Sequence, residues 1–145
     1  MSTAEITRVR QILLNNAPAI LNNQPVLLCY LYGSFAREDI HSFSDIDIGI
    51  YVKKMNSETM LDIELSLALE FDGIVGHGCN VDVRSINYMP LVMKGNIVTE
   101  GILLYSQNDP FRIEFETSVR REYFDFRPFI IQYQNTYLAN CLTGT

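Results

Sequence analysis

Residues 26–52 read VLLCYLYGSFAREDIHSFSDIDIGIYV, two apolar runs joined by a polar connection. The first run, residues 26–32, is continuously apolar and of strand length, which is typical of a strand buried on both faces and predicts the central strand of a sheet. The second run, residues 45–52, alternates between apolar and polar residues and predicts a strand with one face in the core. The polar connection between them would therefore lie at one end of the sheet.

Helix and strand patterns continue on both sides of this stretch. A capping-box pattern at Ser2 and Glu5, followed by apolar residues at helical spacing, predicts an opening helix to about Asn16. Further elements are expected as a helix at residues 57–71 ended by Asp72-Gly73, a strand in NVDVRSI (residues 80–86), a short helix from Asn87 to about Asn96, a strand at residues 101–105 and a long helix capped by Asp109-Pro110. Arg127-Pro128 is expected to kink or end that long helix.

This order of elements predicts an α/β or α+β fold with helices packed mainly on one face of the sheet. The 145 residues fit a single domain spanning residues 1–145. Hydrophobic residues make up 48% of the chain and charged residues 19%, which is typical of folded globular proteins. The net charge of −6 gives no general attraction for phosphate backbones, so we expect no extended nucleic-acid binding.

The sequence shows neither a secretory signal pattern nor an apolar run near the ~20 residues that cross a bilayer. We therefore expect a cytoplasmic protein that has no membrane partner. Cys29, Cys79 and Cys141 are isolated and lack a C-x-x-C pairing. This pattern favours reduced, mostly buried cysteines over a disulfide framework or a zinc site.

Two aspartates mark the start of the second strand. Asp45 and Asp47 are two residues apart, so their carboxylates project from the same face, where their mutual repulsion is costly unless a positive charge lies between them. A divalent cation is the natural partner, and Mg2+ prefers carboxylates together with substrate phosphates. A lone D-x-D is usually only a solvated strand end.

A glycine-serine turn stands ten residues before this pair. Gly33 allows the backbone to approach a phosphate closely, Ser34 adds a hydroxyl donor, and a helix starting near Phe35 would add amide dipoles. A lone Gly-Ser is usually only a turn, but together with the two aspartates it predicts adjoining anion and metal sites. Arg37 is either a further phosphate contact or a cation on the helix surface.

Asp82 is the third candidate acid, because in NVDVRSI it points away from the face of Val81 and Val83. If this strand neighbours the one that carries Asp45 and Asp47, three carboxylates converge. Three acids can hold two metal ions, and Asp82 would then lie nearest the nucleophile as metal ligand and general base. An outward-facing acid on a strand is otherwise a common surface residue.

At these residues the chain resembles the nucleotidyltransferase superfamily related to DNA polymerase beta. The signature of that family is G-S, ten residues and then D-x-D, and it stands here as YGSFAREDIHSFSDIDI. The small size and the segment GILLYSQNDPFRIEFETSVRREYFDFRPFI are similar to the minimal nucleotidyltransferases (MNT, MntA-like) of HEPN/MNT toxin-antitoxin pairs. Glu38 stands where the family usually has glycine, which puts nucleotide affinity in question.

The resemblance implies a mixed-sheet nucleotidyltransferase fold with a long C-terminal helix, ATP as substrate and two Mg2+ ions as cofactors. It implies that Gly33 and Ser34 bind phosphate and that Asp45, Asp47 and Asp82 are the metal-binding and catalytic acids. It also implies an antitoxin that transfers AMP to a tyrosine of its HEPN ribonuclease partner.

Two alternatives stay open. The first is an antitoxin that acts only by covering its toxin, and the second is a nucleotidyltransferase for a small molecule. Aromatic residues near the carboxyl end offer partial support for a contact surface, although packing on the sheet would also explain them. They are Tyr123, Phe124, Phe126, Phe129, Tyr133 and Tyr137.

Overall fold

The computed structural model describes residues 3–37, 45–76 and 80–143. Its elements in chain order are α1 (Thr3–Leu21), β1 (Val26–Tyr32), α2 (Ser34–Arg37), β2 (Ile46–Val52), α3 (Ser57–Val75), β3 (Val81–Ser85), α4 (Leu91–Glu100), β4 (Ile102–Ser106) and α5 (Asp109–Thr143). The described strands form a sheet in the order β3-β2-β1-β4. β1 is antiparallel to β2 and to β4, whereas β2 and β3 run parallel, so the sheet is mixed.

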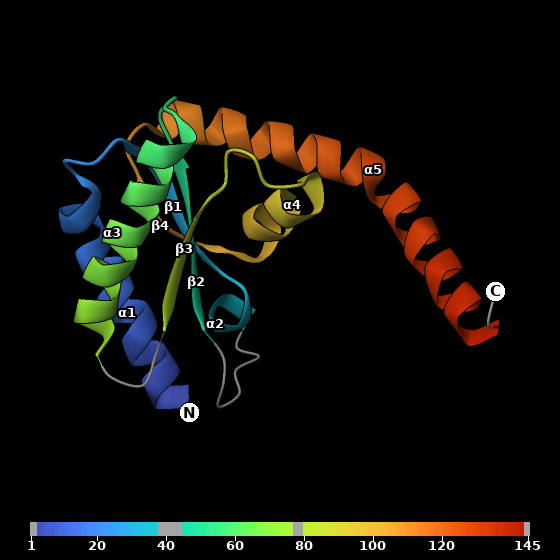
Figure 1. Cartoon of the computed structure of the whole chain (residues 1–145), viewed down its shortest axis with the longest axis horizontal. Coiled ribbons are helices and arrows are strands. Elements are labelled where there is room, and N and C mark those ends of the chain that lie inside the picture. Colours follow the sequence, from blue (N-terminus) through green and yellow to red (C-terminus); the bar gives the residue numbers. More distant parts are fainter. Residues whose placement is uncertain (1–2, 38–44, 77–79, 144–145) are drawn as a thin grey trace.

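The two faces of the sheet are covered unequally (Figure 1). α1 and α3 lie on one face and enclose the larger core, where Ile46, Ile48 and Ile50 of β2 are fully buried. α4 and the beginning of α5 cover part of the opposite face around a smaller cluster that includes Tyr30 and Ile86. The predicted α/β fold, with helices mainly on one face and a long C-terminal helix, is confirmed.

Two helices are longer than their sequence patterns suggested. α1 continues past the expected end at Asn16 to Leu21, because Ala17 and Leu21 extend its buried stripe. The expected cap at Ser2 lies outside the described residues. α3 continues through Asp72-Gly73 to Val75, because Val75 is buried in the core. The prediction that Asp72-Gly73 ends α3 was wrong: the helix ends at Gly76, whose φ of +88° suits glycine.

Asn87 does not cap a helix. Its side chain accepts a hydrogen bond from the Val52 amide at 3.0 Å and donates one to the Val52 carbonyl at 2.8 Å. α4 begins only at Leu91, after Pro90. The predicted start of this helix at Asn87 was therefore wrong. The Asn87 side chain, which follows β3, bonds instead to the last residue of β2.

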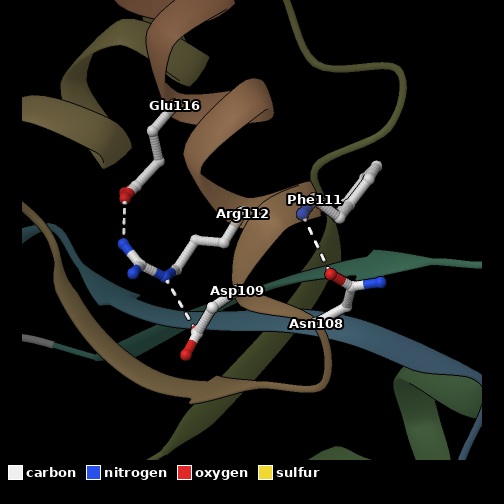
Figure 2. A network of polar contacts seen from close by, with 5 residues as sticks. All are labelled: Asn108, Asp109, Phe111, Arg112 and Glu116. Carbon is white, nitrogen blue, oxygen red and sulfur yellow. Dashed lines mark hydrogen bonds and ion pairs between the residues drawn. The ribbon is translucent and has the colours of Figure 1, made fainter.

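The start of α5 is fixed by a polar network (Figure 2). The Asn108 side chain accepts a hydrogen bond from the Phe111 amide at 3.1 Å, so the cap stands one residue before the predicted Asp109. The Arg112 guanidinium contacts Asp109 at 3.3 Å and Glu116 at 2.9 Å. Glu116 is 8% exposed, so this ion pair supplies the counter-charge that a buried carboxylate needs.

α5 runs through Pro128, so of the two outcomes predicted for Arg127-Pro128, a kink or an end, the helix does not end there. The alternative, a kink, agrees with the change of direction along α5 in Figure 1. Proline lacks the amide hydrogen that would bond one turn back, which is a common cause of such a bend. The helices within the described ranges include none with the length and apolar character to cross a membrane.

Two of the three cysteines fall within the described residues. Cys29 is free and buried in β1, as predicted, and burial raises the pKa of its thiol. Cys141 is free but exposed on α5, so the expectation of burial was wrong there. Cys79 lies outside the described residues. The unpaired state of Cys29 and Cys141 agrees with the prediction of reduced thiols.

Candidate functional site

The parallel pairing of β2 with β3 brings two of the predicted acids side by side. Asp47 and Asp82 are direct partners across these strands. Both alternate with residues of the larger core, so their side chains lie on the opposite face of the sheet. Asp45 lies two residues before Asp47, is exposed, and stands directly ahead of β2. The structure therefore gathers the three acids at one end of the sheet.

The turn after β1 lies against this acid pair. Tyr32, the last residue of β1, pairs with Asp47 across the antiparallel ladder. Gly33 follows with φ of +69°, a left-handed conformation that favours glycine. A Cβ atom at Gly33 would collide with Oδ2 of Asp47 and would stand 3.4 Å from its Cγ. Glycine is therefore required here for both the backbone angle and the space beside the carboxylate.

α2 is a single turn that begins at Ser34 and is tied to the rest of the fold by two sets of bonds. The Ala36 and Arg37 amides donate to the Gly33 carbonyl at 3.2 and 3.1 Å. The Arg10 guanidinium of α1 donates to the carbonyls of Phe35 at 2.8 Å and Ala36 at 2.9 Å. These contacts hold the glycine-serine turn in place at the edge of the acid cluster.

The acids of this site influence one another electrostatically. Burial raises the pKa of Asp47, and the Asp82 and Asp45 carboxylates raise it further, while the Arg84 and Arg37 guanidiniums lower it. Burial, followed by the Asp47 charge, also raises the pKa of Tyr32 to about 12. Burial is the main cause of both shifts, and the neighbouring carboxylates add to it.

Arg84 is the cation in contact with the acids. Its Nε lies 2.8 Å from Oδ2 of Asp82, and both side chains are partly exposed. The Asp82 charge is the main cause that raises the pKa of Arg84, and Asp47 adds to it. Within the ranges that the structure describes, no three His, Cys, Asp or Glu side chains are already grouped to hold a metal ion.

Arg37, which the sequence left as either a phosphate contact or a surface cation, lies at the end of α2. Its Nη1 stands 3.8 Å from Oε2 of Glu100, with about half of each side chain exposed. Such an exposed pair is weak, so Arg37 can exchange Glu100 for another anion at little cost. Its position near Asp47 is compatible with both readings.

Four contributors to this corner were missed by sequence reasoning. Tyr32 and Arg84 carry no motif of their own, although the alternating pattern of NVDVRSI does place Arg84 on the face of Asp82. Gly49 is missed because its role is spatial: a Cβ there would stand 3.0 Å from the Ile86 side chain and 3.4 Å from the Tyr32 ring. Arg10 acts from α1, far away in sequence, and no local signal predicts its contact with α2.

The donor chemistry of the site fits a divalent cation. Three carboxylates offer the hard oxygen ligands that Mg2+ prefers, and the Asp82 and Asp45 charges add to burial in raising the pKa of Asp47. Asp82 would have to release Arg84 to take part, which an exposed ion pair permits. The residues present are therefore suitable for a metal ion and for the phosphates that it accompanies.

Solved structures share this fold. A crystal structure described as a toxin-antitoxin with AMP-PNP is 20% identical, covers 83% of this chain and 98% of its own, and has a TM-score of 0.57. A tri-AMPylated Shewanella oneidensis HEPN toxin in complex with MNT antitoxin gives 18% identity, 86% and 98% coverage and a TM-score of 0.57. The toxin-antitoxin MntA-HepT gives 19% identity, 86% and 98% coverage and a TM-score of 0.52. At these identities the likeness shows the fold.

A comparison with curated proteins finds no match. The family model described as polymerase beta, nucleotidyltransferase matches residues 15–110, which are about two thirds of the chain and include the acids and the glycine-serine turn. The chain therefore belongs to the polymerase beta nucleotidyltransferase family.

Proposed function

We propose that this protein is the antitoxin of a HEPN/MNT pair and transfers AMP from ATP to a tyrosine hydroxyl of its HEPN toxin, with Mg2+ as cofactor. The observation that carries the proposal is the pairing of Asp47 with Asp82 beside the Gly33 turn. Family membership supports nucleotidyl transfer. The descriptions of the similar structures, which name AMP-PNP, an AMPylated HEPN toxin and an MNT antitoxin, support the choice of nucleotide and acceptor.

In this proposal Asp45, Asp47 and Asp82 hold two magnesium ions, as the three-carboxylate arrangement allows. When bound, the ions would neutralise the triphosphate and favour departure of pyrophosphate. Gly33 leaves room for a phosphate beside the Asp47 carboxylate, and Ser34 offers a hydroxyl donor at the start of α2. Arg37, whose contact with Glu100 is long and exposed, is free to move to a phosphate oxygen.

The chemical step forms a bond between the tyrosine oxygen of the toxin and the α-phosphorus of ATP. The bond from that phosphorus to the bridging oxygen of the leaving group breaks, and pyrophosphate departs with the electron pair. Asp82 takes the phenol proton, for which its carboxylate must first leave Arg84.

A second candidate is an antitoxin that silences the toxin only by covering it. The ion pair between Asp82 and Arg84 favours this alternative, because Asp82 already has a partner in the metal-free fold. The alternative predicts neutralisation that is independent of ATP and of the acids.

The two candidates are separated by one reaction. The full-length protein is incubated with ATP, Mg2+ and the HEPN protein encoded beside it, and the intact mass of the toxin is measured. We expect the toxin to gain whole AMP increments with wild type and with the control Asp62→Asn, which alters an exposed acid of α3. Asp47→Asn should add none. Neutralisation by Asp47→Asn without any AMP would establish the covering role instead.

A further inference from the structure

The outer part of α5 extends away from the sheet and its covering helices (Figure 1). The last residue of α5 that packs closely on α4 is Tyr123, whose ring lies where a side chain at Gly95 would be. Beyond it, each residue from 124 to 142 whose burial the structure describes is exposed. Most of the stability of helices in proteins comes from packing of an apolar face, so this segment needs a further contact.

Large apolar side chains of this segment are exposed and fall on two faces of the helix. Phe126, Phe129, Tyr133 and Tyr137 follow one another at spacings of three, four and four, and are 54%, 67%, 74% and 60% exposed. Residues at this spacing share one side of a helix, which we call the aromatic face. The opposite side carries Phe124, Ile131, Leu138 and Leu142, which are also exposed. Such continuous apolar surface marks an interface.

The charge pattern indicates what covers the aromatic face. Residues 128–145 contain no Asp, Glu, Lys or Arg, although the chain as a whole has a net charge of −6. All charged side chains lie in residues 1–127, which we call the body. Two acidic bodies would repel one another, but two copies of the uncharged segment would not. Because the helix projects from the body, an antiparallel pair would hold the two bodies at opposite ends.

We propose that the aromatic face of α5 pairs with the same face of a second copy of this chain, in an antiparallel, two-fold symmetric contact. Aromatic side chains bury ~150–250 Å² each, so four of them at the exposures given above supply on the order of 500 Å² per copy. Two copies together then reach roughly 1,000 Å², the lower limit for a stable protein interface. The contact repeats the same residues on both sides, as two-fold pairing requires.

The test uses the full chain alone, with its mass measured by analytical ultracentrifugation over a range of concentrations. We expect a species of twice the 16.6 kDa of one chain, and small-angle scattering from an elongated particle with mass at both ends. The double variant Phe129→Lys/Tyr133→Lys should raise the dimer dissociation constant at least tenfold. The double control Gln132→Lys/Asn135→Lys adds the same charge outside the aromatic face and should leave the dimer intact.

Circular dichroism on each variant separates loss of pairing from loss of folding, because the body of the protein should keep its thermal transition. A wild-type chain that stays monomeric at every concentration would overturn the proposal, as would a dimer that the double variant leaves unchanged. If wild type is monomeric and the double variant loses only its binding to the toxin, the aromatic face serves the toxin and not a second copy. Binding of MgATP is a separate readout and should be the same in all variants.

Discussion

Gly33→Ala is the substitution that tests the site geometry most sharply, and Gly76→Ala is its matched control. Both glycines have positive φ, +69° and +88°, and Gly76 also has a ψ of −172°, a region occupied almost only by glycine, so either alanine incurs about 1–3 kcal/mol of backbone strain. For a chain of this size that corresponds to a fall of roughly 3–9 °C in the unfolding midpoint. The two sites differ in space: a Cβ at Gly33 collides with the Asp47 carboxylate, whereas one at Gly76 meets no atom of the described residues within 4 Å.

The collision gives Gly33→Ala a second effect that Gly76→Ala lacks. To regain van der Waals distance the Asp47 carboxylate must move by roughly 1 Å, whereas metal ligands keep their distances to within about 0.2 Å. We therefore expect MgATP affinity, measured by isothermal titration calorimetry, to fall at least tenfold in Gly33→Ala and to stay unchanged in Gly76→Ala. Equal MgATP affinity in the two variants would refute the assignment of this turn and of Asp47 to the nucleotide site.

The remaining predictions concern single contacts. Burial and the neighbouring acids raise the pKa of Asp47, so ionisation of its carboxyl group opposes folding. The protonated group stabilises the fold at a pH below its ordinary pKa of 3.8, and this stabilisation is lost as the pH rises through the pKa of the folded state. Asp47→Asn should therefore raise the unfolding midpoint of the metal-free protein at pH 7, with a gain that shrinks towards pH 4; a lower midpoint at pH 7 would contradict this. Arg84→Ala should tighten Mn2+ binding about thirtyfold in a spin-resonance titration, since one unit charge about 4 Å from a divalent ion is worth ~2 kcal/mol in water; weaker binding would show that Arg84 does not compete for Asp82. Gly95→Ala should lower the free energy of unfolding, measured in urea, by ~1–3 kcal/mol, because the new methyl group meets the Tyr123 ring. In the double variant Gly95→Ala/Tyr123→Ala the two changes in free energy should not add up. Strict additivity would argue against the contact.

Much of the sheet could be predicted from the sequence, because burial imposes a period of two on each strand. The alternation of Ile46, Ile48 and Ile50 with Asp47 was enough to assign the faces of β2. The sequence did not predict that β2 and β3 are neighbours, and the convergence of the three acids depended on that assumption. Strand order is decided by contacts between segments that are distant in sequence. The register that pairs Asp47 with Asp82 could come only from the structure.

The errors at helix ends share one physical cause, which is that core contacts override local signals. Gly73 is a typical stop residue, but the burial of Val75 extends α3 by another turn. Asn87 is a typical cap residue, but it gains two hydrogen bonds from Val52 in the sheet. The contact of Arg84 with Asp82 was likewise undetermined, since the alternating pattern predicts a shared face and not a hydrogen bond.

The central claim is that Asp45, Asp47 and Asp82 hold the metal ions that accompany ATP. The most direct measurement is anomalous diffraction from crystals of the full chain grown with Mn2+ and a non-hydrolysable ATP analogue. We predict manganese peaks within coordination distance of Asp45, Asp47 and Asp82, with Arg84 turned away from Asp82 and the phosphates beside Gly33. Manganese and nucleotide bound elsewhere, with Arg84 still on Asp82, would contradict the account.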